Sequence, residues 1–176
     1  RVLGAKFPVY IMVTKCDLIQ GAVKFCDRLD DTVLQQAMGR INHPLTADVK
    51  SFSGQTVRAM AERLKELRLL ILNAAGKQAD PSLMILPKEF EKLEPGLDAF
   101  MRGALHENPY QETPILRGIY FSSGRQEGTP YSHFLNAMGL IGEKDVLPGT
   151  NRGLFLHDFF SRILPADRGL FAPTQK

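Results

Sequence analysis

Long hydrophobic runs are missing from this 176-residue sequence. The longest apolar stretches, Phe7 to Val13 and Leu69 to Leu72, fall far short of the roughly 20 residues that a membrane-spanning helix needs. A strong excess of one charge is also missing, because 22 basic residues are balanced by 19 acidic ones and the basic residues are scattered. Nucleic-acid binding requires basic side chains gathered on one face, so we expect no nucleic-acid partner.

Cysteine and histidine are too sparse to form a covalent framework or a metal centre. The two cysteines, Cys16 and Cys26, form neither a disulfide pattern nor a Cys-x-x-Cys motif, which favours a reducing compartment. None of the four histidines lies four residues from another, as two ligands on one helix face would. We therefore expect no metal site.

The phosphate-binding motif G-x-x-x-x-G-K-[ST] does not occur either. Gly76-Lys77 is the only Gly-Lys pair, and Ile71 stands at the position of the leading glycine. Without this loop and an acidic Mg²⁺ partner, phosphoryl transfer has no electrostatic clamp and no positioned water. Residues 1–176 alone are therefore not expected to hydrolyse GTP or ATP. The sequence begins with Arg1 and soon reaches a strand-like run, which suggests a piece of a longer protein.

Two apolar runs predict strands that are buried on both faces of a mainly parallel sheet. Phe7 to Thr14 and Ile115 to Phe121 are rich in β-branched and aromatic residues, and the second run ends at a polar turn. About 100 residues separate the two runs, far more than the dozen or so that a parallel crossover requires. The sequence therefore predicts an α/β fold with two parallel strands, a large α-helical insertion and C-terminal helices.

The region between the strands has the periodicity of amphipathic helices. Two helices are predicted to pack as an antiparallel pair, with Pro87 in the first turn of the second helix and a break at Pro95-Gly96. Before them, Ala22 to Met38 predicts one or two shorter helices closed by Gly39. The apolar stripes of the two long helices are Val57, Met60, Leu64, Leu67 and Ile71, and Phe90, Leu93, Leu97, Phe100 and Ala104.

The segment after the second strand predicts two more helical elements. Tyr131 to Met138 predicts a short helix, and a last apolar face ends before Pro165. We interpret this face as core rather than as a partner-binding ridge, because an aromatic stripe at helical spacing usually packs inside. Its residues are Leu154, Phe155, Phe159, Phe160 and Ile163.

Polar residues follow both predicted strands, at the edge where open α/β sheets bind ligands. Thr14-Lys15-Cys16-Asp17 comes directly after the first strand, and Ser122-Ser123-Gly124 follows the second. An ionised Asp17 can accept hydrogen bonds from both the ring N1–H and the exocyclic N2–H₂ of guanine. Lys15 can lay its aliphatic stem over the base, while Thr14 holds the loop. The second loop has the position of the P-loop GTPase segment whose backbone N–H groups contact the guanine oxygen.

Each loop also has a purely structural interpretation. Thr14 to Asp17 can form a turn in which Asp17 caps a helix that starts near Leu18. Ser122 to Gly124 can simply end a strand, for which serine and glycine are ordinary choices. The residues alone leave both interpretations open.

The motifs along the chain together resemble the cytoplasmic region of the IcmF/TssM family. Members of this family are large inner-membrane proteins of bacterial type VI secretion systems, related to IcmF of type IV systems. The most specific block is Leu116 to Gly124 followed by Gln126-Glu127-Gly128. The remaining blocks follow in the family's order over nearly the whole chain: Phe7 to Tyr10, Thr14 to Leu18, Leu86 to Phe90, Asn108 to Tyr110, Leu154 to Leu156 and Ile163 to Pro165.

This resemblance implies that the chain is the C-terminal part of a P-loop NTPase, GTPase-like domain with a helical extension. Residues 1–20 and 113–130 would form the core strands and base-recognition loops. Residues 21–112 would form the helical insertion, and residues 131–176 the C-terminal helical extension.

The resemblance also implies a ligand and the residues that contact it. Thr14, Lys15 and Asp17 match the family's base-recognition motif, and Ser122, Ser123 and Gly124 match the following base loop. GTP, GDP or ATP would bind the full-length domain and would not bind tightly to residues 1–176 alone, because the Walker A residues would lie upstream. No catalytic or metal-binding residue is assigned.

The implied function is that of an assembly component at the cytoplasmic face of the bacterial inner membrane. The partners implied are a DotU/TssL-type inner-membrane protein, baseplate components on the cytoplasmic side and the rest of the same chain. The chain would contribute the base-recognition half of a nucleotide site and a helical docking surface. The alternative is a pure protein-interaction scaffold whose nucleotide site is vestigial.

Overall fold

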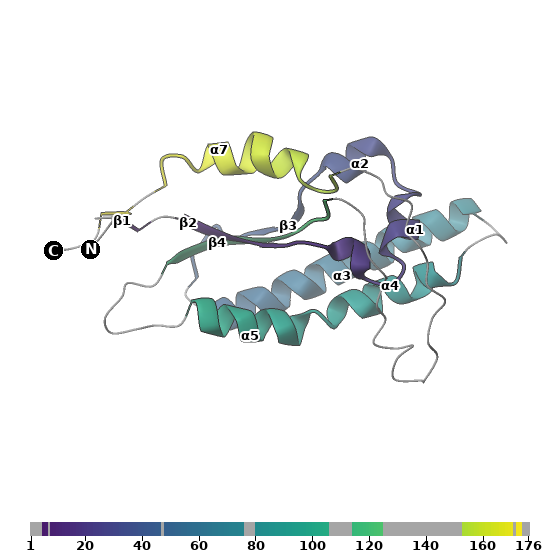
Figure 1. The fold of residues 1–176 in the computed structure, drawn as a ribbon, viewed down its shortest axis with the longest axis horizontal. Coiled ribbons are helices and arrows are strands. Elements are labelled where there is room, and N and C mark those ends of the chain that lie inside the picture. The colour runs from purple at the N-terminus through teal and green to yellow at the C-terminus, as the bar shows by residue number, and fades with distance from the viewer. Residues whose placement is uncertain are drawn as a thin grey trace.

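A mixed three-stranded sheet with the strand order β2-β4-β3 lies at the centre of the fold. The computed structural model describes residues 5–6, 8–46, 48–75, 80–105, 114–124, 153–170 and 172–173. The C-terminal helix lies against one face of the sheet and three helices cover the other, so the sheet is the middle of three layers (Figure 1). The strands are β2 (Pro8–Val13), β4 (Ile115–Phe121) and β3 (Met38–Ile41), and the three covering helices are α3 (Val49–Ala75), α4 (Ser82–Glu91) and α5 (Glu94–Ala104).

The two strands predicted from their apolar runs are neighbours and run parallel. Val13, the last residue of β2, lies opposite Phe121, the last residue of β4. The pairing continues past the strands, since the Ser122 N–H donates to the Val13 carbonyl at 2.8 Å and the Cys16 N–H donates to the Ser122 carbonyl at 3.1 Å. The predicted parallel pairing is therefore confirmed, and both strands end at the same edge of the sheet.

The third strand was not predicted from the sequence. Two short helices, α1 (Ala22–Cys26) and α2 (Asp31–Gln35), do occur where short helices are expected, but Met38 begins β3 instead of ending a helix. This strand pairs antiparallel with β4, with Met38 opposite Phe121. Gly39 makes the approach possible, because a Cβ at this position would clash with the backbone oxygen of Ile119. The insertion between the parallel strands is consequently not all helical.

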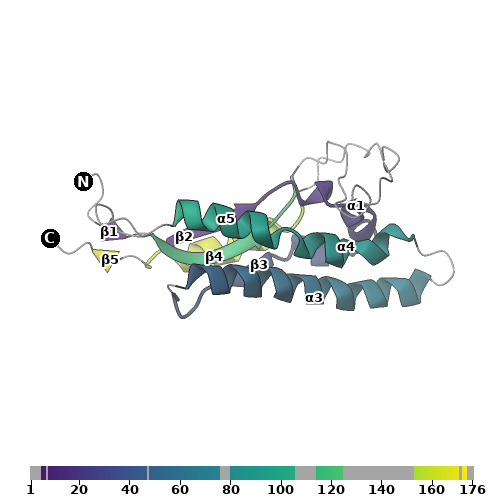
Figure 2. The same ribbon diagram turned by 90° about the horizontal axis from the view of Figure 1, so that it is seen from below.

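The antiparallel pairing of the long helices is confirmed. Two contacts show it. Arg58, early in α3, pairs with Glu94 of α5 at 3.1 Å, whereas Arg68, later in α3, donates to the carbonyl of Met84 in the preceding helix α4 at 2.8 Å. The break near Pro95 is also confirmed, since α4 ends at Glu91 and Pro95 lies in the first turn of α5. In Figure 2, α3 runs alongside α4 and α5 in front of the sheet.

Three details of the prediction for the second helix were wrong, because Pro87 lies elsewhere in the helix and both Phe100 and Ala104 are exposed. The helix begins at Ser82, so Pro87 lies inside α4 rather than in its first turn. Phe100 is 56% exposed, while its neighbour Met101 is buried in the core. The reason is the break between α4 and α5, which resets the helical phase, so that Met101 lies on the buried face four residues after Leu97.

The C-terminal segment packs against the outer face of the sheet. It contains a π-helical turn, η3 (Phe159–Ile163), continued by α7 (Leu164–Ala166). Phe159 is buried, and its ring lies 5.3 Å from that of Tyr10 and 4.9 Å from that of Tyr120. The predicted apolar face is therefore core at Phe159. The prediction is wrong at Phe160, which is 57% exposed, and the helix continues through Pro165 to Ala166.

An ion pair fixes this C-terminal segment to the sheet. Arg117 of β4 donates from Nε to Oδ2 of Asp167 at 2.5 Å and from Nη2 to Oδ1 at 3.2 Å. The Tyr10 hydroxyl donates to the same carboxylate. Arg117 also donates from Nη1 to the Asn42 carbonyl at 2.9 Å, which links β3 to the same cluster. A two-stranded pairing of β1 (Ala5–Lys6) with β5 (Ala172–Pro173) joins the chain near its two ends.

Several sequence predictions concern residues outside the described ones. They include the short helix at Tyr131 to Met138, the Asn108 to Tyr110 block and the Gln126 to Gly128 block. Among the described residues, no helix has the length and apolarity of a bilayer-crossing segment.

Candidate functional site

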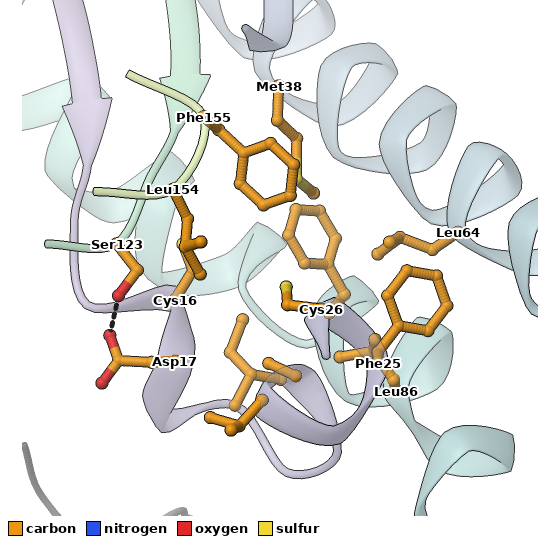
Figure 3. Close-up of a pocket in the computed structure, with 14 residues that line it drawn as sticks. Cys16, Asp17, Phe25, Cys26, Met38, Leu64, Leu86, Ser123, Leu154 and Phe155 are labelled. Atoms are coloured by element: carbon orange, nitrogen blue, oxygen red, sulfur yellow. Dashed lines mark hydrogen bonds between the residues drawn. The ribbon is translucent and has the colours of Figure 1, made fainter. Parts of the chain in front are cut away.

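The two polar loops predicted from the sequence lie side by side at the carboxyl ends of β2 and β4. The first loop continues into a 3₁₀ turn, η1 (Cys16–Leu18). Asp17 in this turn and Ser123 after β4 point toward each other, and the Ser123 hydroxyl donates a hydrogen bond to Oδ1 of Asp17 (Figure 3). Residues more than 100 positions apart in the sequence thus form one site at the sheet edge.

Asp17 is the most unusual side chain of this site. It is only 2% exposed, yet its second oxygen, Oδ2, has no hydrogen-bond partner among the described residues. Burial of an ionised or polar group without a partner costs free energy, and native proteins avoid it except where another group completes the bonding. The carboxylate is therefore held rigidly by Ser123 on one oxygen and left with accepting capacity on the other.

The proposed capping role of Asp17 is not observed. Helix α1 starts at Ala22, and its N-cap residue is Gly21, which has φ 85°. The turn η1 has Lys15 as its N-cap residue and no side-chain cap bond. A Cβ at Gly21 would clash with the backbone oxygen of Ser82, so this glycine also allows α1 to approach α4.

The residues around Asp17 divide into a buried set and an exposed set. Ser122 and Ser123 are buried, whereas Thr14, Lys15 and Gly124 are exposed. Lys15 adopts the left-handed conformation, with φ 62° and ψ 30°. This conformation is uncommon for a residue with a Cβ, and its occurrence in a tightly bonded loop indicates that the surrounding structure imposes it.

A backbone bridge from the C-terminal part of the chain holds the second loop. The Leu154 N–H donates to the Ser123 carbonyl at 2.7 Å, and the Ser123 N–H donates to the Leu154 carbonyl at 3.3 Å. The next residue, Phe155, donates its N–H to the Leu34 carbonyl at 2.7 Å. This role of Leu154 could not be predicted from the sequence, because a backbone bridge places no requirement on side-chain type that a motif could show.

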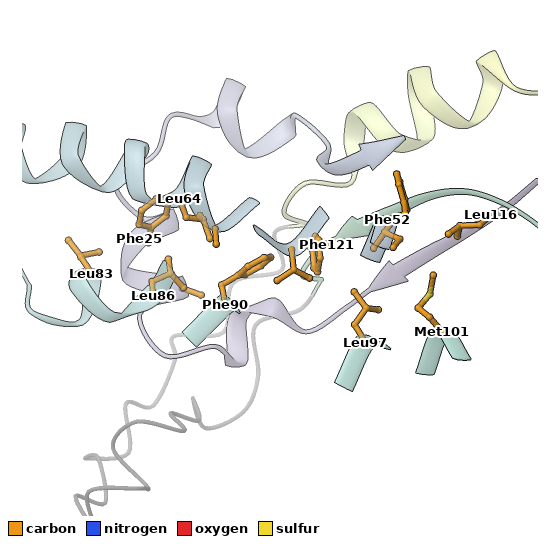
Figure 4. Packing of buried hydrophobic residues seen from close by; sticks show 14 of the residues in the cluster. Phe25, Phe52, Leu64, Leu83, Leu86, Phe90, Leu97, Met101, Leu116 and Phe121 are labelled. Carbon is orange, nitrogen blue, oxygen red and sulfur yellow. The ribbon is translucent and has the colours of Figure 1, made fainter. Parts of the chain in front are cut away.

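The interior behind the loops is apolar. A small cavity of about 30 Å³ lies between η1, α1 and the bridge at Leu154, and Cys16, Cys26 and Phe25 are among its lining residues. Next to it, the rings of Phe90 and Phe121 pack edge to face at 4.8 Å within the main core between the sheet and α3–α5 (Figure 4). The polar groups of the site therefore lie on a rigid apolar base.

Neither cysteine near the site has the properties of a nucleophile. Burial raises the pKa of the Cys16 thiol to about 12 and that of the Cys26 thiol to about 12. Reactive cysteines instead have a lowered pKa, because the thiolate is the reactive species. In the part of the chain that the structure describes, no group of three or more His, Cys, Asp or Glu side chains could hold a metal ion.

The comparison with known families agrees with these motifs. The model of the IcmF-related N-terminal domain matches residues 1–176, the whole of the chain. This chain belongs to the IcmF/TssM family. It is 33% identical over 186 residues to the type VI secretion system component TssM1 of Pseudomonas aeruginosa, an alignment that covers 99% of this chain and 17% of TssM1. No solved structure matches the chain.

Family membership confirms the resemblance that the sequence blocks indicate. Within this IcmF-related chain, all six residues predicted to contact a nucleotide belong to the two neighbouring loops. The side chains of Asp17 and Ser123 contact each other, and those of Thr14 and Lys15 are open to solvent.

Proposed function

We propose that this chain forms the base-recognition half of a GTPase-like nucleotide site in a type VI secretion component. The observation that carries the proposal is the buried Asp17 carboxylate, whose Oδ2 has no partner among the described residues. It lies at the carboxyl ends of two parallel strands, which is where open α/β sheets bind ligands. The three-stranded sheet would then be the C-terminal part of a P-loop NTPase fold.

The chemistry of Asp17 suits guanine. An ionised carboxylate has about four lone-pair positions on its two oxygens. Ser123 uses one of them on Oδ1, so Oδ2 and the remaining lone pair of Oδ1 can accept from N1–H and N2–H₂ of the base. Lys15 belongs to the same loop and is exposed, so its aliphatic stem can cover the base plane.

The second loop offers fewer donors than its sequence suggests. The N–H groups of Ser122 and Ser123 already donate to the Val13 and Leu154 carbonyls. A base carbonyl would therefore be contacted by the N–H of Gly124, an exposed residue around which a Cβ would meet no atom within 4 Å. This refines the expected roles of Ser122 and Ser123 from base contacts to support of the loop.

The ligand of the complete site would be GTP or GDP, with ATP as the competing possibility. The sequence of residues 1–176 has no phosphate-binding loop, so the remainder of the full-length protein supplies the phosphate contacts. This chain spans 17% of the length of TssM1, which leaves room for such a region. The site would operate at the cytoplasmic face of the bacterial inner membrane, in a type VI secretion membrane complex.

The proposal is tested by nucleotide affinity of the full-length protein. Adenine has no pair of adjacent donors for Asp17, so with ADP the buried Oδ2 stays without a partner, at a cost of about 1–3 kcal/mol and more for a charged group. Isothermal titration calorimetry should therefore give an affinity for GDP at least about tenfold higher than for ADP. Equal affinities for the two nucleotides would contradict the assignment of Asp17 to base recognition.

A second candidate function is docking of a protein partner by the helices. Leu69 and Leu70 at the end of α3 are 56% and 65% exposed. The exposed Met84 of α4 lies close to them, because its carbonyl accepts a hydrogen bond from the adjacent Arg68. Partners of the kind that the family resemblance implies are a DotU/TssL-type protein and baseplate components. This surface serves equally well in a scaffold whose nucleotide site is vestigial.

The docking candidate is tested with a matched pair of double variants. Leu69→Glu with Leu70→Glu should weaken a pull-down of the DotU/TssL-type protein by the full-length chain. Lys50→Glu with Ala59→Glu places two glutamates at exposed positions elsewhere on α3 and should leave the pull-down unchanged. Arg68 is unsuitable for such a test, because it bonds α4 and its loss would disturb the helix pair. Equal binding by both double variants would exclude this surface.

A further inference from the structure

The C-terminal segment contacts the sheet at two places, one near each end of β4. At its start, Leu154 exchanges two backbone hydrogen bonds with Ser123, which directly follows β4. At its end, Asp167 accepts from Arg117, near the beginning of the same strand, and from the Tyr10 hydroxyl of β2. Figure 1 shows the helix between these two places, along the outer face of the sheet. The segment therefore runs from the edge that carries the candidate site toward the opposite end of the sheet.

The turn that starts this segment is strained at Phe155. This residue has φ 62°, in the left-handed region that a bulky side chain rarely adopts. Hydrogen bonds hold the turn, because the Leu154 N–H donates to the Ser123 carbonyl and the Phe155 N–H donates to the Leu34 carbonyl. A strained backbone persists only while the surrounding contacts impose it, and such residues are typical of switch regions. Loss of those contacts should therefore let Phe155 relax and open the bridge to Ser123.

The bridge in turn positions the candidate site. The Ser123 hydroxyl donates to Oδ1 of the buried Asp17, so the position of Ser123 determines the bonding of that carboxylate. The N–H and the carbonyl of Ser123 are both bonded to Leu154. Without the bridge, the residue that carries the hydroxyl has no other backbone hydrogen bond among the described residues. The contact between Ser123 and Asp17 therefore depends on a segment at the other end of the sequence.

We propose that the C-terminal segment regulates the Asp17 site. While its helix is docked on the sheet, Leu154 holds Ser123 against Asp17, and release of the helix loosens this contact. Leu154 and Phe155 are positioning residues, because they act on the carboxylate through Ser123. Displacement of the helix would thereby change the affinity of the site without any contact with the ligand. Binding of a guanine nucleotide at Asp17 rests on the proposed function, whereas the coupling of the helix to the Ser123 loop does not.

Hydrogen exchange of the full-length protein without nucleotide tests the coupling. Asp167→Asn removes the ion pair with Arg117 at the far end of the segment, so it should speed exchange of the Ser123 and Leu154 amides at least about tenfold. Leu97→Ala is the matched control, because it removes a buried side chain of α5, on the other face of the sheet, and lowers stability without touching the segment. It should leave those two amides unchanged. Wild-type exchange of both amides in Asp167→Asn, or equal acceleration in the two variants, would overturn the proposal.

Nucleotide affinity of the full-length protein tests the consequence for the site. GDP affinity from titration calorimetry should fall at least about fivefold in Asp167→Asn and stay within about twofold of the wild type in Leu97→Ala. Wild-type GDP affinity in Asp167→Asn would overturn the regulation. Equal binding of GDP and ADP by the wild type would contradict the proposed function instead, and the exchange measurement would still decide the coupling. Tyr10→Phe removes a single donor to Asp167, so it should give smaller changes in the same direction even where Asp167→Asn does not fold.

Discussion

Lys15 combines a strained backbone with an exposed side chain, so its stability role and its ligand role can be separated. A residue with a Cβ in the left-handed region costs roughly 1 kcal/mol or more, and glycine does not pay this cost. Lys15→Gly should therefore leave the melting temperature unchanged or raise it, while Lys15→Ala should give no such gain. Differential scanning calorimetry of the two variants measures the difference. A lower melting temperature for Lys15→Gly than for Lys15→Ala would show that the backbone is not strained.

If the Lys15 stem covers a base, both of these variants should also bind GDP more weakly than the wild type. The melting temperature and the GDP affinity together show whether the strained turn at Lys15 also contributes to nucleotide binding. Loss of affinity without loss of stability is the combination that the proposed function requires.

The Ser123 hydroxyl is predicted to stabilise the protein through Asp17. Ser123→Ala would leave a buried carboxylate without its donor, which should lower the free energy of unfolding by about 1–3 kcal/mol. Ser53→Ala is the matched control, because Ser53 is fully buried but its hydroxyl has no partner among the described residues. Chemical denaturation should show a loss for Ser123→Ala and no loss for Ser53→Ala. Similar values for the two variants would contradict the pairing of Ser123 with Asp17.

The sequence predicted this site only in part. Both loops could be placed at one sheet edge, because parallel strands bring their carboxyl ends together. The burial of Asp17 and its bond to Ser123 could not be predicted, since they depend on the path of η1 and on the bridge at Leu154. The left-handed backbone of Lys15 has no signature at all in a Thr-Lys-Cys-Asp motif.

At the level of elements, an ion pair joins the C-terminal helix to the sheet, in addition to the packing of Phe159. Arg117 and Asp167 are each about 11% exposed, so removal of one partner leaves a poorly solvated charge and should cost about 3 kcal/mol. The hydrogen bond from Arg117 is the largest cause that lowers the pKa of Asp167. Asp167→Asn should therefore lower the stability measured by urea denaturation near neutral pH.

The same pair predicts a pH dependence. A lowered pKa in the folded state stabilises the protein above the unfolded value of about 4, and this contribution is lost as the pH falls through the folded pKa. The stability difference between the wild type and Asp167→Asn should accordingly be largest above about pH 4 and shrink below it. A difference that stays constant down to the acid limit would exclude the ion pair as its cause.

Strand β3 should be sensitive to a single methyl group. Gly39→Ala places a Cβ against the backbone oxygen of Ile119, which cannot move without breaking the pairing with β4. Gly103→Ala is the control, because its Cβ would meet no atom within 4 Å and it lies in α5, where alanine is favoured by up to about 1 kcal/mol. Thermal unfolding should therefore occur at lower temperature for Gly39→Ala and at an equal or higher temperature for Gly103→Ala.

The elements that the sequence predicted are those with strong periodicity. The stripe from Val57 to Ile71 identified α3, and Pro95 identified the break between α4 and α5. Strand β3 was missed because Met-Gly-Arg-Ile is short and contains a glycine, which weakens a strand in isolation. Its pairing is determined by β4, which lies far away in the sequence. Asn42, just after β3, donates from its side chain to the Leu116 carbonyl, 74 residues later.

For the whole molecule, the proposed half-site for a base lies at the carboxyl end of β2, on the far side of the sheet from β3. The helices α3–α5 cover one face and supply the exposed leucines proposed for docking. A nucleotide and a protein partner could thus be bound by different parts of one rigid core, and the family relationship with TssM1 directs attention to secretion-complex assembly.

The most direct test of the central claim is an exchange of base specificity in the full-length protein. Asp17→Asn replaces one carboxylate oxygen with an amide donor, which suits the C2 carbonyl of xanthine and no longer accepts from both guanine donors. Titration calorimetry with GDP and xanthosine diphosphate should show a preference for GDP in the wild type. In Asp17→Asn, GDP affinity should fall by at least about tenfold and the preference should shift toward xanthosine diphosphate. Unchanged affinities for both nucleotides in Asp17→Asn would contradict the claim that Asp17 reads a base, and would favour the scaffold alternative.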